Sequence, residues 1–476
     1  MRARLPLLLL VPVLLGAFAF HAARAEHPTT AYQSADERSY GKLAINIAEQ
    51  RHYGDASTRM RDPLHWPPGA PMLFAAGHAM FGSDASETTL DIPAAYWLQA
   101  LVSIGSALAA FALAALVAGA WAGLVAAALV GFYPPLILAT GEQLSEPLGA
   151  FLVVAAFAAL ALAVRRRALW AYALAGLVLG AAVLTRADLL LAPFAVGAFV
   201  ALTLWIGSRA PRRALLAGGG VIAGALVALA PWSLYASARE GSFIPVTSGS
   251  SSALFVGTYL PGNGTTVGMK RALGAEAKKR NPELRGTPDF DLQARSVLQV
   301  IADRHPDLDF NAAVSREGRR NITRYGFSDP VGFGAMMLNK VQRMWSRYSR
   351  GGARPTSPFI RGWHILLVLA SVGGLVAGAW RGRSIVLGAI ALTLLYSTAV
   401  HMLVVSQARY NLPLMPALIA GGAAGWALLL AGRRRAAAPG KGAQGSRPAK
   451  RSEAPTPPTS SNSPPAAKPA VTSRGS

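Results

Sequence analysis

Apolar runs of about 20 residues follow one another along most of this chain, and a helix of about that length spans the hydrocarbon core of a bilayer. The chain has 476 residues, of which 52% are hydrophobic and only 14% charged. That is more apolar surface than a soluble interior can bury. The sequence therefore predicts an all-α polytopic membrane protein. We expect about ten transmembrane helices, with a range of about 9–13, at residues 5–22, 93–116, 120–138, 144–164, 168–184, 187–207, 214–236, 363–380, 384–403 and 411–431.

Clusters of arginine mark one set of ends of these predicted spans. Lys and Arg are enriched in the short cytoplasmic loops of membrane proteins. All the clusters fall on the same side, so we assign that side to the cytoplasm and expect a multi-pass protein of the cell membrane. The clusters are Arg2 with Arg4, 165–167, Arg209 with Arg212 and Arg213, Arg381 with Arg383, and 433–435.

The predicted spans divide the chain into six segments. Residues 1–22 form the first transmembrane helix, although Ala22-Ala-Arg-Ala25 also resembles the cleavage site of a signal peptide, which is the less favoured alternative. The two long segments 23–92 and 237–362 lie outside the cell, and the second is a mixed helical and loop region. The other segments are a transmembrane core at 93–236, the C-terminal transmembrane helices at 363–431, and a tail at 432–476 whose composition predicts disorder in the cytoplasm.

The net charge of +23 does not indicate a nucleic-acid partner. From Arg433 onward the tail alone has nine basic residues against the single Glu453, and the other basic clusters are topology signals. The chain has no cysteine, which excludes disulfides, thiolate catalysis and a cysteine-ligated zinc site. Any chemistry must use carboxylates, His, Lys, Arg, Tyr or the backbone.

Two adjacent carboxylates, Asp36 and Glu37, stand in the first outer loop. Apolar residues at 43, 44, 47 and 48 have helical spacing, which predicts a short amphipathic helix along the membrane surface. Its dipole favours the ionised carboxylates at its start, and ordinary helix capping is the alternative role. His65-Trp-Pro-Pro-Gly69 follows in the same loop, where consecutive prolines stiffen the chain.

Glu142 and Glu146 lie one turn apart at the outer end of the predicted span 144–164. Glu146 leads directly into an apolar run, so we expect it to face protein or a water-filled cleft. His65 with Glu142 or Glu146 would suit a divalent cation, but the spacing alone does not establish a metal site.

Arg186 and Arg409 also fall at outer ends of predicted spans. Arg186 pairs with Asp188 or receives a phosphate, because a guanidinium is permanently charged and its forked geometry matches phosphate oxygens. Arg409 and Tyr410 precede the last span, either as interfacial anchors or as a second contact for an anionic head group.

This ordered set of motifs resembles the C-type glycosyltransferase superfamily, and within it the bacterial relatives of protein O-mannosyltransferases (glycosyltransferase family 39) and of the lipid A aminoarabinose transferase. The resemblance extends over residues 1 to about 431. Its marks are Asp36-Glu37 with Tyr40 and Leu43-Ala44, His65-Trp-Pro-Pro-Gly69, Ser145-Glu-Pro-Leu148, Thr185-Arg186, Pro231-Trp232, and Arg409-Tyr-Asn-Leu-Pro413 with Pro416.

The resemblance implies transfer of a monosaccharide from a polyprenyl-phosphate donor to an unidentified extracytoplasmic acceptor, with inversion. Asp36 would be the catalytic base, supported or replaced by Glu37. We expect substrate contacts from Tyr40, His65, Glu142, Glu146, Arg186, Arg409 and Tyr410. The alternatives are a transporter or flippase of lipid-linked sugars, which predicts polar residues through the membrane midplane, an O-antigen ligase or polymerase, and a non-catalytic scaffold.

Overall fold

The computed structural model describes residues 4–28, 35–54, 63–82, 90–208, 210–346, 357–382 and 384–437. The chain divides into two compact units, Met1–Gly432 and Arg433–Ser476, and the account below concerns the first of them. Within the described ranges the regular structure is entirely helical. The expectations for Arg2, Arg209 and Arg383 and for the tail beyond residue 437 lie outside the described residues.

The transmembrane prediction is confirmed as an all-α polytopic arrangement. Eight helical segments are long and apolar enough to cross a membrane. A ninth is a bent pair, α5 (Ala120–Gly131) with α6 (Pro134–Thr140), and the shorter apolar helix α8 (Leu169–Thr185) occupies the remaining predicted span. The eight are α1 (Leu5–Glu26), α4 (Pro93–Ala118), α7 (Glu146–Arg166), η2 with α9 (Ala187–Leu189 and Ala192–Ser208), α10 (Pro211–Glu240), α16 (Pro358–Gly382), α17 (Ile385–Leu403), and η5 with α18 (Ala408–Leu414 and Met415–Ala437).

The predicted span 120–138 is not one straight helix. It bends by 51° between α5 and α6, where two consecutive prolines begin α6 and Tyr133 takes an extended backbone conformation. Proline has no N–H to donate and disfavours the helical conformation in the residue before it. The carbonyl of Gly131, next to the break, accepts a hydrogen bond from Nε2 of His21 in α1 at 3.2 Å.

Small residues allow the helix backbones to approach closely, as is usual where lipid gives no hydrophobic drive for helix association. A Cβ atom at Gly224 of α10 would overlap the backbone of Ala173 in α8, and one at Gly218 would overlap that of Gly197 in α9. Large apolar side chains remain exposed on the outer faces of the spans, for example Leu8 of α1 and Leu234 of α10. These faces are suited to lipid.

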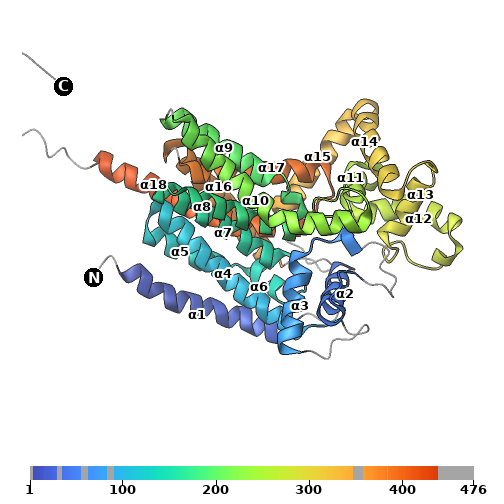
Figure 1. The fold of residues 1–476 in the computed structure, drawn as a ribbon, viewed down its shortest axis with the longest axis horizontal. Helices are drawn as coiled ribbons and strands as arrows, with labels where there is room; N and C mark the ends of the chain where they lie inside the picture. The colour runs from blue at the N-terminus through green and yellow to red at the C-terminus, as the bar shows by residue number, and fades with distance from the viewer. Residues whose placement is uncertain are drawn as a thin grey trace, which may run out of the picture. The chain divides into compact units, whose positions relative to one another are not determined.

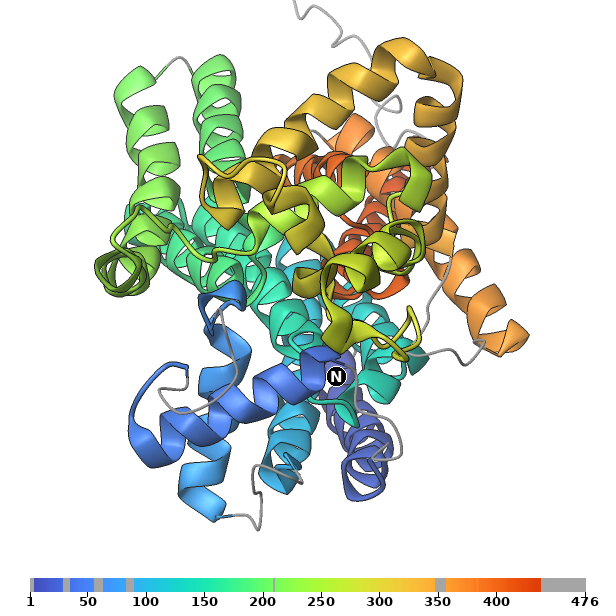
Figure 2. The same cartoon turned by 90° about the vertical axis from the view of Figure 1, so that its right-hand side faces the viewer.

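The remaining helices gather at one end of the spans, on the right in Figure 1 and towards the viewer in Figure 2. The first of the two long segments predicted to lie outside the cell, the first outer segment, supplies α2 (Ala35–Gln50), η1 (Pro63–His65) and α3 (Gly69–Phe81), with a small core that includes Tyr40, Phe74 and Ile92. The second supplies α11 (Ser250–Thr258), η3 (Leu260–Gly262), α12 (Thr266–Arg280), η4 (Pro282–Leu284), α13 (Ala294–Ala302), α14 (Phe310–Ser328) and α15 (Pro330–Ser346), with a core of its own around Phe255 and Leu298.

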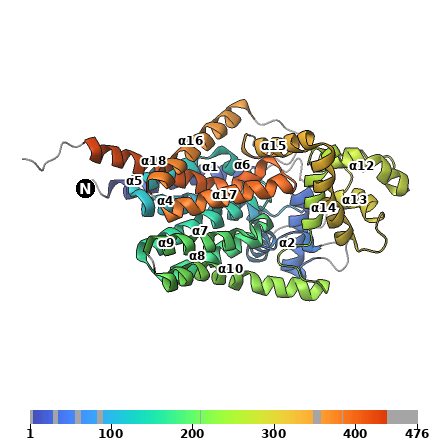
Figure 3. The ribbon, with the colours of Figure 1, turned by 90° about the horizontal axis from the view of Figure 1, so that it is seen from above.

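The start of α1, the α7–α8 turn and the α9–α10 turn lie at the opposite end, on the left in Figures 1 and 3. The described members of three predicted arginine clusters, namely Arg4, 165–167, Arg212 and Arg213, belong to these elements. The expected orientation therefore has a direct test, because the chain contains no cysteine and single cysteines can be introduced freely. We expect an impermeant maleimide to label Lys279→Cys in α12 on intact cells and to label Arg166→Cys only after lysis. Labelling of Arg166→Cys on intact cells would contradict the orientation.

Lys340 connects α15 to two other helices. Its side chain is completely buried, and Nζ donates to the carbonyls of Gly257 at 2.9 Å and Met402 at 2.6 Å. These carbonyls belong to the last turns of α11 and α17, where backbone oxygens have no partner within their own helix and favour a nearby cation. Lys340 thus joins the outer helices to a membrane span.

We expect Lys340→Met to lower the free energy of unfolding by about 2–6 kcal/mol, because two buried carbonyls lose their donor and each costs about 1–3 kcal/mol. Thermal unfolding in detergent measures the loss. The matched control is Lys279→Met, at an exposed position on α12. Equal unfolding temperatures for the two variants would show that Lys340 has no such role.

Candidate active site

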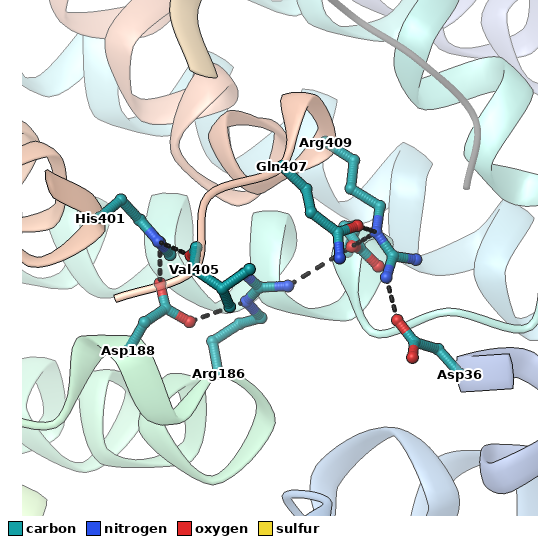
Figure 4. Close-up of polar contacts among 8 residues, drawn as sticks. Asp36, Arg186, Asp188, His401, Val405, Gln407 and Arg409 are labelled. Atoms are coloured by element: carbon teal, nitrogen blue, oxygen red, sulfur yellow. Dashed lines mark hydrogen bonds and ion pairs between the residues drawn. The ribbon is translucent and has the colours of Figure 1, made fainter. Parts of the chain in front are cut away.

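Six ionisable side chains from five separate segments form one connected polar network (Figure 4). We define the polar network as Asp36, Glu146, Arg186, Asp188, His401 and Arg409. Asp36 comes from the first outer segment, while the others lie at the ends of membrane spans. The network therefore joins parts of the chain that are up to 373 residues apart in sequence.

Breaks between helices explain why these side chains can meet. Glu146 is the first residue of α7, Arg186 follows the last residue of α8, and Arg409 lies in the 3-10 helix η5 that precedes α18. Asp36 stands in the first turn of α2. At a helix end the chain changes direction, so side chains from several spans can converge on one point instead of facing lipid.

Arg409 is the hub on one side of the polar network. Its Nη2 donates to a carboxylate oxygen of Asp36 in a close ion pair, and its Nε lies 3.4 Å from Oε1 of Glu146. Nε also donates to the side-chain oxygen of Gln407 at 3.1 Å. The Arg409 side chain is only 7% exposed, so these partners replace water around its charge.

Arg186 is the hub on the other side. Its Nε donates to Oδ1 of Asp188 at 3.0 Å, and its Nη1 lies 3.4 Å from the same Glu146 oxygen that faces Arg409. The second oxygen of Asp188 lies 3.3 Å from Nε2 of His401, in the last turn of α17. Asp188 thus holds Arg186 in place, which is one of the two roles predicted for Arg186 from the sequence. Glu146 bridges the guanidiniums of Arg186 and Arg409.

Two tyrosines border the polar network. The ring of Tyr410 lies under Arg186, with Cζ 4.8 Å from the ring centroid, and 5.0 Å from the ring of His401. Tyr40 is buried and hydrogen-bonded with Ser145, next to Glu146. Burial, together with the negative charge of Asp36, raises the pKa of Tyr40 well above its ordinary value. Its hydroxyl therefore stays protonated.

Of the nine predicted site residues, Asp36, Glu146, Arg186 and Arg409 belong to the polar network, and Tyr40 and Tyr410 lie against it. Glu37, Glu142 and His65 are not members. Glu37 is buried near Tyr96, so it faces a different side of α2 from Asp36. His65 packs on Trp66, at 4.8 Å between ring centroids, and Trp66 in turn packs on Tyr40 at 5.4 Å. Among the described residues no group of three or more His, Asp or Glu side chains is arranged to hold a metal ion.

His401 and Gln407 were not among the residues predicted from the sequence, and Asp188 was predicted only as a partner of Arg186. A histidine within an apolar span was the available signal for His401, because ionisable residues in such spans are uncommon and face the protein interior. Gln407 gave no signal of its own apart from its position two residues before Arg409.

The charges of the polar network are nearly balanced. Three carboxylates face two guanidiniums, which leaves a net charge of −1 when His401 is neutral. Two polar atoms in this part of the described structure are nevertheless buried without a hydrogen-bond partner, namely Nη1 of Arg409 and Oε2 of Glu146. Buried atoms of this kind are rare in native proteins, and a bound ligand is one explanation for them.

Solved structures provide a comparison for this arrangement. AglB, the archaeal oligosaccharyltransferase from Archaeoglobus fulgidus, solved with an inhibitory peptide and a dolichol-phosphate, matches with a TM-score of 0.52 and 16% sequence identity over 89% of this chain and 50% of that chain. The apo form of the Archaeoglobus fulgidus oligosaccharyltransferase matches with a TM-score of 0.50 and 15% identity, covering 90% of this chain and 51% of that chain. The chain has the fold of the C-type glycosyltransferases.

This chain spans about half the length of the oligosaccharyltransferase, of which 50% is covered. ArnT from Cupriavidus metallidurans bound to undecaprenyl phosphate also matches, with a TM-score of 0.41 and 15% identity over 91% of this chain and 80% of that chain. No family model and no curated protein matches the sequence. The likeness to the oligosaccharyltransferase confirms the fold that the resemblance of the motifs implied.

Proposed function

We propose that this protein is a glycosyltransferase of the cell membrane that moves a monosaccharide from a polyprenyl-phosphate donor to an acceptor outside the cell. The observation that carries the proposal is the pairing of Asp36 with the buried Arg409 inside a C-type fold. This arrangement puts a carboxylate, suited to take a proton, next to a cation suited to a phosphate. The oligosaccharyltransferase of the same fold was solved with a dolichol-phosphate, which supports a lipid phosphate as the donor's leaving group.

Donor binding must displace a carboxylate, because the polar network already carries a small excess of negative charge. Asp36 is the carboxylate best placed to leave. Its side chain is 24% exposed, against 2% for Glu146, and among the described residues Arg409 is its ion-pair partner. Asp188 is held by both Arg186 and His401. We propose that a donor phosphate oxygen takes the place of Asp36 on Arg409 and also uses the free Nη1 of that guanidinium.

Displaced from Arg409, Asp36 is available as the base. Its carboxylate takes the proton of an acceptor hydroxyl or amine as the acceptor atom forms a bond to the anomeric carbon. The bond from that carbon to the phosphate oxygen breaks, and polyprenyl phosphate leaves with the electron pair. The anomeric configuration inverts. Base assistance of this kind contributes about 10²–10⁴-fold in rate, and cationic stabilisation of the departing phosphate by Arg409 and Arg186 adds to it.

The position of the polar network favours an enzyme over a transporter of lipid-linked sugars. Transporter sites lie near the bilayer midplane, between repeated halves with broken helices. Here Glu146 and Asp188 lie at the first turns of their spans and His401 at the last turn of its span. Because these turns lie at the end away from the arginine clusters, the positive-inside rule supports a site that faces outward.

Sealed membrane vesicles of known orientation test the proposal. Vesicles that contain the protein are supplied on the outer face with radiolabelled polyprenyl-phosphate sugars or, separately, with the corresponding nucleotide sugars. We expect label to reach an acceptor only from the lipid-linked donor, and not in matched vesicles that lack the protein. Transfer from nucleotide sugars alone would overturn the proposed donor class.

A further inference from the structure

A pocket of about 480 Å³ lies between the beginnings of α8 and α10, at the end of the spans away from the polar network. We refer to it as the basic pocket, because its lining includes Arg167, Arg212 and Arg213. Leu169 and Leu216 form part of its wall. Its volume lies within the range of about 300–1,000 Å³ that is usual for small-molecule sites.

The electrostatics of the basic pocket favour an anion. Three arginines line it, and none of the described residues that line it is acidic. Nη2 of Arg213 donates to the carbonyl of Arg167 at 2.9 Å, which holds the two lining segments together and leaves the other guanidinium donors of Arg213 available. The first turns of α8 and α10, which begin at Leu169 and Pro211, add partial positive charge at the same place.

The apolar part of the basic pocket distinguishes a lipid from a soluble anion. Leu169 is 42% exposed and Leu216 is 49% exposed, and each has a strongly exposed apolar neighbour, Trp170 at 64% and Leu215 at 68%. An acyl chain attached to the bound head group would pack on this surface, whereas an inorganic anion would make no contact with it. The positive-inside rule accounts for basic residues at the cytoplasmic end of a helix. It does not account for a pocket there or for the apolar wall of that pocket.

We propose that the basic pocket binds the head group of an anionic glycerophospholipid, with the phosphate among the arginines and the acyl chains along the leucines. Basic pockets between transmembrane helices bind anionic head groups in this way. The site is separate from the polar network and does not depend on the proposed transferase activity. It would fix the α8–α10 pair in the leaflet opposite the active site.

Native mass spectrometry of the full-length, delipidated protein tests this inference, with phosphatidylglycerol as the probe and phosphatidylcholine as the neutral comparison. We expect phosphatidylglycerol to bind more tightly than phosphatidylcholine. The variant Arg167→Gln/Arg212→Gln/Arg213→Gln should bind phosphatidylglycerol about tenfold or more weakly, since each basic side chain near an anionic lipid contributes roughly a fivefold factor. The variant Arg167→Lys/Arg212→Lys/Arg213→Lys should retain most of the affinity.

The matched control is Arg271→Gln/Lys279→Gln/Arg285→Gln, which removes the same charge from exposed positions in α12 and directly after η4. It should bind phosphatidylglycerol as the wild type does. Equal affinity of the pocket variant and the wild type would overturn the proposal. Complete competition by inorganic phosphate would also overturn it, because the site would then be one for a soluble anion only.

Discussion

Arg409→Met is expected to unfold at a much lower temperature than the wild type and to transfer sugar about 10²–10³-fold more slowly. Arg409 is buried and pairs with both Asp36 and Glu146. Removing one partner from a buried ion pair typically costs about 3–5 kcal/mol, because the remaining charge has lost its compensation. Thermal unfolding in detergent and initial rates of transfer from a polyprenyl-phosphate sugar measure the two effects.

A double variant separates the two roles of Arg409. Arg409→Met/Glu146→Gln removes one of the carboxylates that Arg409 balanced, so part of the lost stability should return, with a coupling of about 0.5–3 kcal/mol. Transfer should not return, since no guanidinium would stand beside Asp36. Arg409→Lys, which keeps the charge but not the forked geometry, should be intermediate in rate. Wild-type transfer by Arg409→Met would exclude Arg409 from the donor site.

Asp36→Asn should lose transfer while the fold persists. The substitution keeps the size of the side chain and removes only the charge and the ability to take a proton, which is worth about 10²–10⁴-fold in rate. The matched variant is Glu37→Gln, because Glu37 is the adjacent carboxylate on α2 and lies outside the polar network. We expect Glu37→Gln to keep a rate within about tenfold of wild type, on the view that only Asp36 meets the acceptor. The two variants are compared by their rate constants for transfer at saturating donor, normalised to the amount of folded protein. Equal losses of rate in the two variants would mean that neither Asp36 nor Glu37 alone is the catalytic base.

The sequence predicted the membrane spans well because that prediction needs only the length and polarity of a run. Each predicted span corresponds to a helix or a bent pair of helices. The bend between α5 and α6 was missed, although Pro134 and Pro135 mark it in the sequence. A hydropathy average does not register that two prolines remove backbone donors, and the run was therefore interpreted as one straight helix.

The members of the active site were partly predictable, but their pairing was not. Arg186 and Arg409 stood out because they lie at the span ends opposite the arginine clusters, where the positive-inside rule does not account for them. That Glu146 bridges both arginines depends on how α7, α8 and η5 pack, which no local pattern contains. The sequence likewise does not show which of Asp36 and Glu37 faces Arg409, because consecutive helical residues point about 100° apart. Only the rotation of α2 against its neighbours decides which of them faces Arg409.

His401 was missed for a related reason. A single histidine in an apolar helix has no spacing or motif that connects it to a partner. Its contact with Asp188 spans 213 positions in the sequence and arises from the packing of α17 against η2. Long-range contacts between helix ends determine this part of the polar network, and local propensity has no influence on them.

The most direct test of the central claim uses the purified protein in proteoliposomes with a radiolabelled polyprenyl-phosphate sugar and an acceptor fraction from the cell envelope. Wild type and Asp36→Asn are compared at equal amounts of folded protein. The account predicts that label leaves the lipid and enters an acceptor with wild type, with one polyprenyl phosphate released for each sugar transferred, and at least about 10²-fold more slowly with Asp36→Asn. Transfer by Asp36→Asn at the wild-type rate would contradict it.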